Sequence, residues 1–291
     1  MVSQLTVADW QRGQDALRQE VQRVTALLRS IKDPTVPAVG SWNLGDVAVH
    51  LSQAWLLVNC LAQQDLSPFH VMIPRAAGVA GGAVVKDFWD WGDLVTNRGV
   101  ESDLERNLAV LADRIDELAD RYFSECVEAD SDAPRQWIAE GITFGQSVLT
   151  YHALNETVVH GYDIARAAGR PWRIEPAHAS MVLTRFIIPL VRVADPRMFV
   201  NDAAAAGLRA TYDVRIRGGE AFHFIFDDGA LSIEDPSSRR VDCHISADPA
   251  AFLLVVWARQ SQWSAIATGK LMAWGRKPWL GFRLRSLIRN P

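Results

Sequence analysis

Residues 154–165 read LNETVVHGYDIA, and this stretch decides how the first half of the chain is interpreted. Glu156 and His160 stand four residues apart in it, which is about one turn of an α-helix. Both side chains therefore project from one face of the helix and can reach a common ion. The helix is predicted to run from residue 144 to residue 168, because Gly169 follows as a stop signal.

Apolar residues at helical spacing predict three further helices upstream. One spans residues 6–31 and starts at a capping box of Thr6 and Asp9, and the next spans residues 43–64 and is capped by the asparagine at its start. A third is expected to begin at Ser102. It carries apolar side chains at Leu104, Leu108, Leu111, Ile115 and Leu118. Four amphipathic helices of this length predict a four-helix bundle, in which site residues lie on facing helices.

The segment between the second and third of these helices, residues 65–100, is rich in glycine and alanine around residues 78–83. Such a composition predicts a long excursion or lid rather than a regular element.

The hydrophobic period changes after a further helix that begins at Pro176. Four segments that alternate or run apolar are predicted to be strands: residues 208–216, 220–226, 230–234 and 240–246. Helices are expected from residue 176, over residues 248–258 and from residue 263. This order predicts an α+β domain with its helices on one face of the sheet. The chain is therefore expected to form two domains, residues 1–172 and 173–291.

The composition argues against several classes of protein. The 291 residues include 30 basic and 34 acidic side chains, a formal net charge of −4, which does not predict nucleic-acid binding by the whole chain. No secretory signal is visible, and no uninterrupted apolar run reaches the length of about 20 residues that a membrane span needs. A cytoplasmic protein without a membrane span is expected. The sequence has three cysteines, Cys60, Cys126 and Cys243, and no CxxC pair. This argues against a disulfide framework and against a thiolate metal cluster.

His50, Glu156 and His160 are candidate metal ligands. His50 lies one turn after Asp46 on the second helix and could face the same interior as the pair on the fourth. Two imidazoles and one carboxylate make a three-ligand set like that of catalytic zinc sites, with a fourth position open. A divalent ion and one glutamate leave a net charge of +1, which favours an anionic ligand.

Simpler interpretations of these residues stay open. A glutamate and a histidine one turn apart are often a surface pair or a helix-stabilising contact. His152 extends the stripe of Glu156 and His160 by one more turn and is a reserve ligand. Asp163, one turn after His160, either orients a ligand or lies on the solvated face.

Two segments carry a family resemblance. Residues 41–51, SWNLGDVAVHL, resemble the W-x-x-x-D-x-x-x-H-L signature of the mycothiol-dependent maleylpyruvate isomerase family, in the DinB-like group of metal-binding bundles. Residues 155–165 resemble the family's second signature, E-x-x-x-H-x-x-D-x-A. The resemblance implies a DinB-like four-helix bundle in which His50, Glu156 and His160 hold a divalent metal, with zinc the expected ion.

The same resemblance implies an activity. Mycothiol would be the thiol cosubstrate, and its thiolate would add to a small electrophile, for isomerisation or for S-transfer. None of the three metal ligands needs to act as an acid or a base, so the catalytic residues stay unassigned. Residues 241–254 and 269–275 resemble the sterol-carrier-protein-2-like domain often attached to this bundle, which implies an apolar cleft and a possible hydrophobic ligand.

The last 43 residues, 249–291, contain seven basic side chains, no acidic one and four tryptophans. They can hold a carboxylate or a phosphate, or they form a basic surface. Arg259 is the predicted substrate-anion contact. The tryptophans, which are Trp257, Trp263, Trp274 and Trp279, are expected to pack in the core rather than to bind nucleic acid.

Three functions are compatible with these observations. The first is a metal-dependent thiol transferase or isomerase that uses mycothiol. The second is a non-catalytic lipid or acyl-ligand binder with a structural metal. The third is an interaction protein that has kept the bundle and lost activity.

Overall fold

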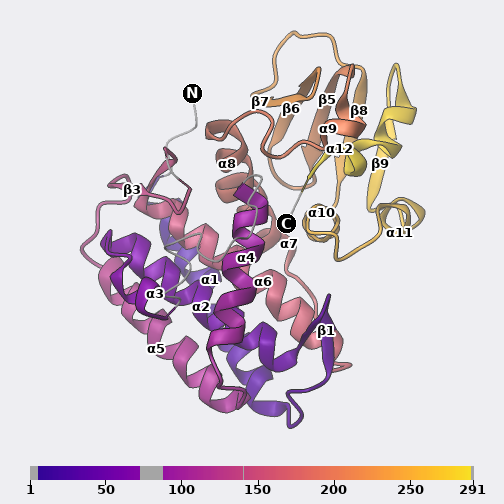
Figure 1. Cartoon of the computed structure of the whole chain (residues 1–291). Helices are drawn as coiled ribbons and strands as arrows, with labels where there is room; N and C mark the ends of the chain where they lie inside the picture. Colours follow the sequence, from indigo (N-terminus) through magenta and orange to yellow (C-terminus); the bar gives the residue numbers. More distant parts are fainter. Residues whose placement is uncertain (1–5, 73–87, 140, 290–291) are drawn as a thin grey trace. The chain divides into compact units, whose positions relative to one another are not determined.

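The structure is a computed structural model that describes residues 6–72, 88–139 and 141–289. The chain divides into two compact units, Met1–Ile174 and Glu175–Pro291 (Figure 1). The first unit is helical and the second contains a mixed β-sheet. The predicted α+β class, with a helical first half, is confirmed.

Four long helices form the core of the first unit (Figure 1). They are α1 (Val7–Ser30), α2 (Leu44–Gln63), α5 (Leu108–Cys126) and α6 (Gln146–Ala167). Helices α1 and α2 each pack against both α5 and α6. The side chains between them are fully buried and mostly aliphatic, and they include Leu17, Leu28, Leu51, Leu111 and Leu154. The predicted four-helix bundle is therefore present.

Reciprocal caps start α1 and α2 as predicted. Thr6 accepts a hydrogen bond from the backbone of Asp9, whose side chain accepts from the backbone of Thr6. Asn43 and Asp46 repeat this arrangement at α2. Each box satisfies two backbone donors that the helix itself leaves unpaired, which is why these starts can be found from local sequence.

The predicted start of the third helix at Ser102 is wrong. Asn107 is the cap of α5, and its side chain accepts from the backbone N–H groups of Ala109 and Val110. Ser102 is instead the last residue of the preceding helix, and Leu104 is 90% exposed in the loop between them. Leu104 fits the helical spacing of the buried residues that follow it, but it lies before the helix begins, so the pattern does not apply to it.

The predicted excursion contains helices at both ends. These are α3 (Ser67–Met72) and α4 (Phe88–Ser102); α4 packs against α2 and buries Val95 and Val100. The glycine- and alanine-rich stretch at residues 78–83 lies outside the described residues. Two short hairpins were not predicted, because their strands have only two or three residues. They are β1 (Pro37–Val39) with β2 (Trp42–Asn43), and β3 (Pro134–Gln136) with β4 (Thr143–Gly145).

Within the described residues, α2 is the helix that is long and apolar enough to cross a membrane. Its most apolar window is 78% buried inside the structure. This burial is what the central helix of a bundle requires, and α2 is accounted for as a core helix.

The second unit is built on a five-stranded sheet in the order β7-β6-β5-β8-β9. Its strands are β5 (Arg209–Ile216), β6 (Ala221–Asp227), β7 (Ala230–Glu234), β8 (Cys243–Ala247) and β9 (Leu271–Trp274). All neighbours are antiparallel except β5 and β8. The turn between β6 and β7 places Asp228 and Gly229 at positive φ, as a tight hairpin turn requires. Strand β9, four residues at the sheet edge, was not predicted.

Short helices complete the second unit. They are α7 (Pro176–Val182), the π-helix η1 (Leu183–Ile187), α8 (Ile188–Val193), α9 (Asp202–Ala205), α10 (Pro249–Val256), α11 (Gln262–Ala267), the 3-10 helix η2 (Pro278–Phe282) and α12 (Leu284–Leu287). The side chain of Asp248 caps α10 by accepting from the backbone of Ala251. The helices predicted from residue 176, over residues 248–258 and from residue 263 are present.

Candidate metal centre

Packing of α2 against α6 brings His50 to Glu156 and His160. One ligand atom from each of the three lies within 4.8 Å of the others. The Glu156 Oε2 atom is 3.6 Å from His50 Nε2 and 3.4 Å from His160 Nε2. The structure therefore places together the three residues that the sequence analysis selected as metal ligands.

These spacings fit a tetrahedral ion. Zinc bonds of about 2.0–2.2 Å at tetrahedral angles place neighbouring ligand atoms about 3.3–3.6 Å apart. The two measured carboxylate-to-imidazole distances, 3.4 and 3.6 Å, fall in this interval. The donor set of two nitrogens and one oxygen is one that catalytic zinc sites use. The residues present therefore fit a divalent metal.

The site is partly enclosed. The side chains of His50, Glu156 and His160 are 18%, 16% and 10% exposed. The two imidazole rings meet nearly at right angles, with centroids 4.6 Å apart. The three side chains are therefore mostly shielded from water but keep some contact with solvent.

Asp163 supports His160 from behind. Its side chain is only 2% exposed, and its Oδ2 atom lies 3.2 Å from His160 Nδ1. A carboxylate on the second nitrogen fixes the orientation of an imidazole and leaves its Nε2 atom for a ligand. Asp163 is therefore in the interior beside His160 and does not lie on the solvated face.

The charges in the site stabilise one another. Burial acts to raise the pKa of Glu156, but the adjacent imidazoles of His160 and His50 outweigh it, so this pKa lies well below its usual value. Burial acts to lower the pKa of His160, but Asp163 and Glu156 outweigh it and raise the pKa to about 9. A cation that binds at His160 Nε2 must therefore displace a proton at neutral pH.

His152, the reserve ligand, approaches the other oxygen of Glu156. Its Nε2 atom is 3.7 Å from Glu156 Oε1, and its ring lies 5.9 Å from the ring of Trp137. Burial lowers the pKa of His152, against the opposing charge of Glu156. His152 thus lies beside the group of three but is not part of it, and its role as a ligand stays a prediction.

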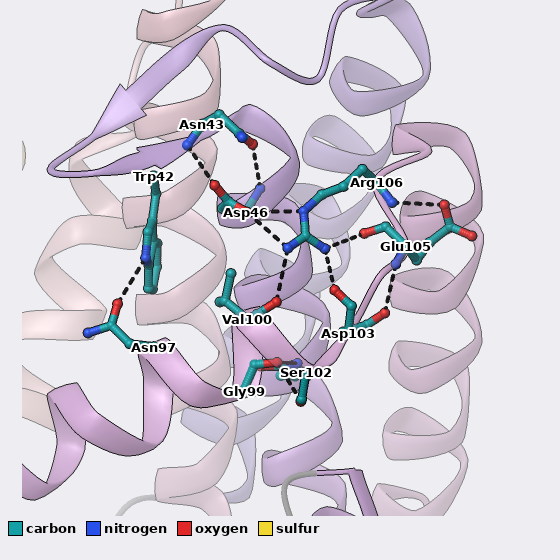
Figure 2. A network of polar contacts seen from close by, with 11 residues as sticks. Trp42, Asn43, Asp46, Asn97, Gly99, Val100, Ser102, Asp103, Glu105 and Arg106 are labelled. Carbon is teal, nitrogen blue, oxygen red and sulfur yellow. Dashed lines mark hydrogen bonds and ion pairs between the residues drawn. The ribbon is translucent and has the colours of Figure 1, made fainter. Parts of the chain in front are cut away.

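The acidic residue of the first signature, Asp46, is a structural anchor. Besides the cap at α2, its Oδ1 atom accepts from Arg106 Nε at 3.0 Å (Figure 2). The other guanidinium N–H groups of Arg106 donate to the backbone carbonyls of Val100, Asp103 and Glu105. Arg106 therefore ties the start of α2 to the end of α4 and to the loop before α5. Sequence reasoning missed Arg106, because no local pattern marks it.

Arg259, the predicted substrate-anion contact, lies in the second unit just after α10. It is half-buried, and its Nη1 atom donates to the carbonyl of Trp257 at 2.9 Å. Its contact with a substrate stays a prediction. The expectation that the nearby tryptophans pack in the core is wrong for Trp263, Trp274 and Trp279, which are 62%, 43% and 58% exposed.

The second unit also contains a cavity of about 290 Å³. Its lining is mostly apolar and includes Ile245, Phe252, Val255, Ile266, Phe282 and Ile288. An apolar lining is what a hydrophobic ligand requires, and a cavity of about 150 Å³ is already large enough to hold benzene.

Comparisons with known proteins agree with these two architectures. Residues 197–275 match the family described as the SCP-2 sterol transfer family. The chain is similar to the crystal structure of a mycothiol-dependent maleylpyruvate isomerase, with a TM-score of 0.50 and 10% identity over 91% of this chain and 92% of the other. A histidine-to-alanine mutant of such an isomerase aligns with a TM-score of 0.48 and 9% identity over the same shares. No curated protein matches in sequence.

At this identity the similarity shows the fold alone. The resemblance derived from the two signatures and the carboxyl-terminal segment is confirmed at that level. The chain shares its fold with mycothiol-dependent maleylpyruvate isomerase, and residues 197–275 are similar to the SCP-2 sterol transfer family.

Proposed function

We propose that the first unit is a divalent-metal enzyme that activates a low-molecular-weight thiol, mycothiol, for attack on a small electrophile. The reaction is an isomerisation or an S-transfer. The observation that carries the proposal is the convergence of His50, Glu156 and His160 at spacings that fit a tetrahedral ion. The fold shared with a mycothiol-dependent maleylpyruvate isomerase supports the choice of thiol and of reaction class.

Each residue of the site contributes a separate property. A divalent metal held here, zinc by expectation, supplies a Lewis acid that lowers the pKa of a bound thiol. His50 and His160 offer neutral nitrogen ligands, and Glu156 offers the single negative charge. One carboxylate ligand does not neutralise a divalent cation, which favours a thiolate as a further ligand, although the Asp163 carboxylate behind His160 offsets part of the remaining positive charge. Asp163 holds the ring of His160 in the orientation that presents Nε2.

The test measures metal content and turnover on the full chain. Zinc-loaded protein should bind one equivalent. With mycothiol present it should either convert an isomerisable substrate without net loss of thiol, or consume mycothiol with an alkylating substrate. The His50→Ala variant should lose zinc affinity by more than about 100-fold and lose turnover with it. His178→Asn, at a buried histidine of α7 in the second unit, is the matched control and should keep both.

Two outcomes would contradict the proposal. Unchanged zinc binding and turnover in His50→Ala would remove the metal site from these residues. Zinc occupancy without turnover on any thiol would make the metal structural.

The cytoplasmic location expected from the sequence stays a prediction, which subcellular fractionation tests.

A second candidate function rests on the cavity of the second unit. We infer that this cavity binds a hydrophobic ligand such as an acyl chain, because its lining is mostly apolar. Native mass spectrometry of the purified chain should show a co-purifying lipid. Val255→Trp, which fills the cavity, should lose that ligand, whereas Val193→Trp at an exposed position of α8 should retain it. A ligand retained equally by both variants would contradict the inference.

A further inference from the structure

The ring of His50 contacts two other rings. The indole of Trp42 lies 5.2 Å from it at an interplanar angle of 46°, and the imidazole of His160 lies 4.6 Å away at 82°. The last torsion of a histidine is broad and has no sharp staggered minimum. Packing by neighbours therefore decides where His50 Nε2 points. His160 is itself one of the three proposed ligands, whereas Trp42 is a neighbour from outside the ligand set.

The indole of Trp42 is itself fixed by α4. Its Nε1–H group donates to Asn97 Oδ1 at 3.0 Å (Figure 2). The amide nitrogen of Asn97 donates to the carbonyl of Asp93, one turn earlier on α4, at 2.8 Å. That second hydrogen bond decides which end of the amide faces the indole, because only the oxygen can accept from an N–H group. The indole is therefore held at a defined angle.

The backbone under Trp42 is also fixed. Strand β2 pairs Trp42 with Val39 of β1, and the next residue, Asn43, caps α2. The capping partner Asp46 is held by Arg106 from the loop between α4 and α5 (Figure 2). The position of the indole is thus set by α2, α4 and this loop, whereas Glu156 and His160 are carried by α6. Through its ring contact with His50, Trp42 therefore connects α4 and this loop to the proposed ligands.

We propose that Trp42, oriented by Asn97, is a positioning residue of the metal centre that fixes the ring of His50 toward Glu156 and His160. This inference rests on the metal site of the proposed function. Trp42 acts on the metal through His50 and is not a ligand. Outer partners of metal ligands typically contribute about 10–100-fold to metal affinity, because they remove the freedom that a ligand would otherwise lose on binding.

The test compares zinc affinity, measured by competition with a chromophoric chelator, and the visible absorption spectrum of the cobalt-substituted protein. Trp42→Leu should weaken zinc binding by about 10–100-fold and alter the cobalt spectrum, since the spectrum reports the geometry around the ion. Trp42→Phe keeps a planar ring but cannot donate to Asn97, so it should recover only part of both. Asn97→Leu, which removes only the hydrogen bond to the indole, should lie between wild type and Trp42→Leu.

Trp172→Leu is the matched control. Trp172 is also half-buried in the first unit, where its ring packs beside Gly161 of α6 and under Arg23, and neither of these contacts involves a proposed ligand. Its loss should lower thermal stability without changing zinc affinity or the cobalt spectrum. A merely structural role for Trp42 would give the same pattern as this control.

The outcomes separate the two proposals. If wild type binds zinc and the Trp42→Leu and Asn97→Leu variants bind it equally well with the same cobalt spectrum, the positioning role is wrong and the proposed function stands. If wild type binds neither zinc nor cobalt at these residues, the proposed function and the positioning role are both wrong. If Trp42→Leu does not fold, Asn97→Leu decides alone, because it removes a single hydrogen bond beside a half-buried ring.

Discussion

Each unit brings histidine and carboxylate side chains together, but the carboxylates of the two groups differ in whether they accept short hydrogen bonds from their neighbours. In the second unit, Asp213 of β5 accepts from Arg215 Nε at 2.8 Å and lies 2.8 Å from His244 Nδ1 of the neighbouring strand β8. In the first unit, Glu156 Oε2 stands 3.4 and 3.6 Å from two imidazole nitrogens. The two distances at Asp213 are those of ordinary hydrogen bonds, about 2.7–3.2 Å, whereas the two distances at Glu156 are longer.

The difference indicates which group can accept an ion. The Asp213 carboxylate already has direct hydrogen bonds to Arg215 and His244. The His244 ring stacks on Trp274, with centroids 5.5 Å apart. The Glu156 group holds its donors around a common point at ligand-to-ligand spacing. Similar side chains thus form a structural pair on a sheet and a candidate metal centre between helices.

The largest expected effect is on metal affinity. Glu156→Gln removes the only negative ligand and should reduce zinc affinity by more than about 100-fold, whereas Asp213→Asn should leave it unchanged. Competition titration with a chelator measures both. Loss of zinc binding in Asp213→Asn, with zinc binding retained in Glu156→Gln, would show that the metal binds at Asp213 and not at Glu156.

Metal addition should stabilise the first unit. Zinc at about 100 times its dissociation constant raises the free energy of unfolding by about 2.7 kcal/mol, and a chelator removes the gain. Differential scanning calorimetry of the full chain should show the shift in wild type and not in His50→Ala. An equal shift in both would place the ion elsewhere.

Loss of the Asp213 carboxylate should act on stability alone. The side chain is buried, and Asp213→Asn should lower the free energy of unfolding by about 1–3 kcal/mol at pH 7. Urea denaturation of both proteins measures the difference.

The same variant has a pH signature. Burial acts to raise the pKa of Asp213, but His244 and Arg215 outweigh it and hold the pKa below the ordinary value of 3.8. A lowered pKa contributes stability that is present above the unfolded value and is lost as the pH falls through the folded value. The difference between wild type and Asp213→Asn should therefore shrink below about pH 4. A difference that grows on acidification would contradict this.

The smallest effect is expected at the reserve ligand. His152→Gln should change zinc affinity by less than about tenfold, because His152 approaches the opposite oxygen of Glu156. The chelator titration used for Glu156→Gln measures it. A loss of zinc affinity as large as that of His50→Ala would show that His152 is a ligand and that the proposed set of three ligands is wrong.

Local chemistry explains which predictions from the sequence are correct. The starts of α1 and α2 follow from capping boxes whose partners are three residues apart, and the shared face of Glu156 and His160 follows from helical periodicity. The start of α5 was misplaced because Ser102 and Asn107 are both acceptable caps by residue type. The structure shows why the chain stays out of a helix between them: Arg106 donates to backbone carbonyls of this loop, and the Asp103 and Glu105 side chains accept from the loop's backbone N–H groups.

The sequence by itself determined the helices of the bundle, the strands β5 to β8, and the residue types of a metal site, since each depends on neighbours a few residues away. Tertiary structure decided that His50 of α2 meets Glu156 of α6 across more than a hundred residues of sequence, that Asp163 faces His160, and that Trp42 lies against His50. The physical reason is that periodicity fixes the direction of a side chain on its own helix, whereas the packing of one helix on another fixes which side chain it meets.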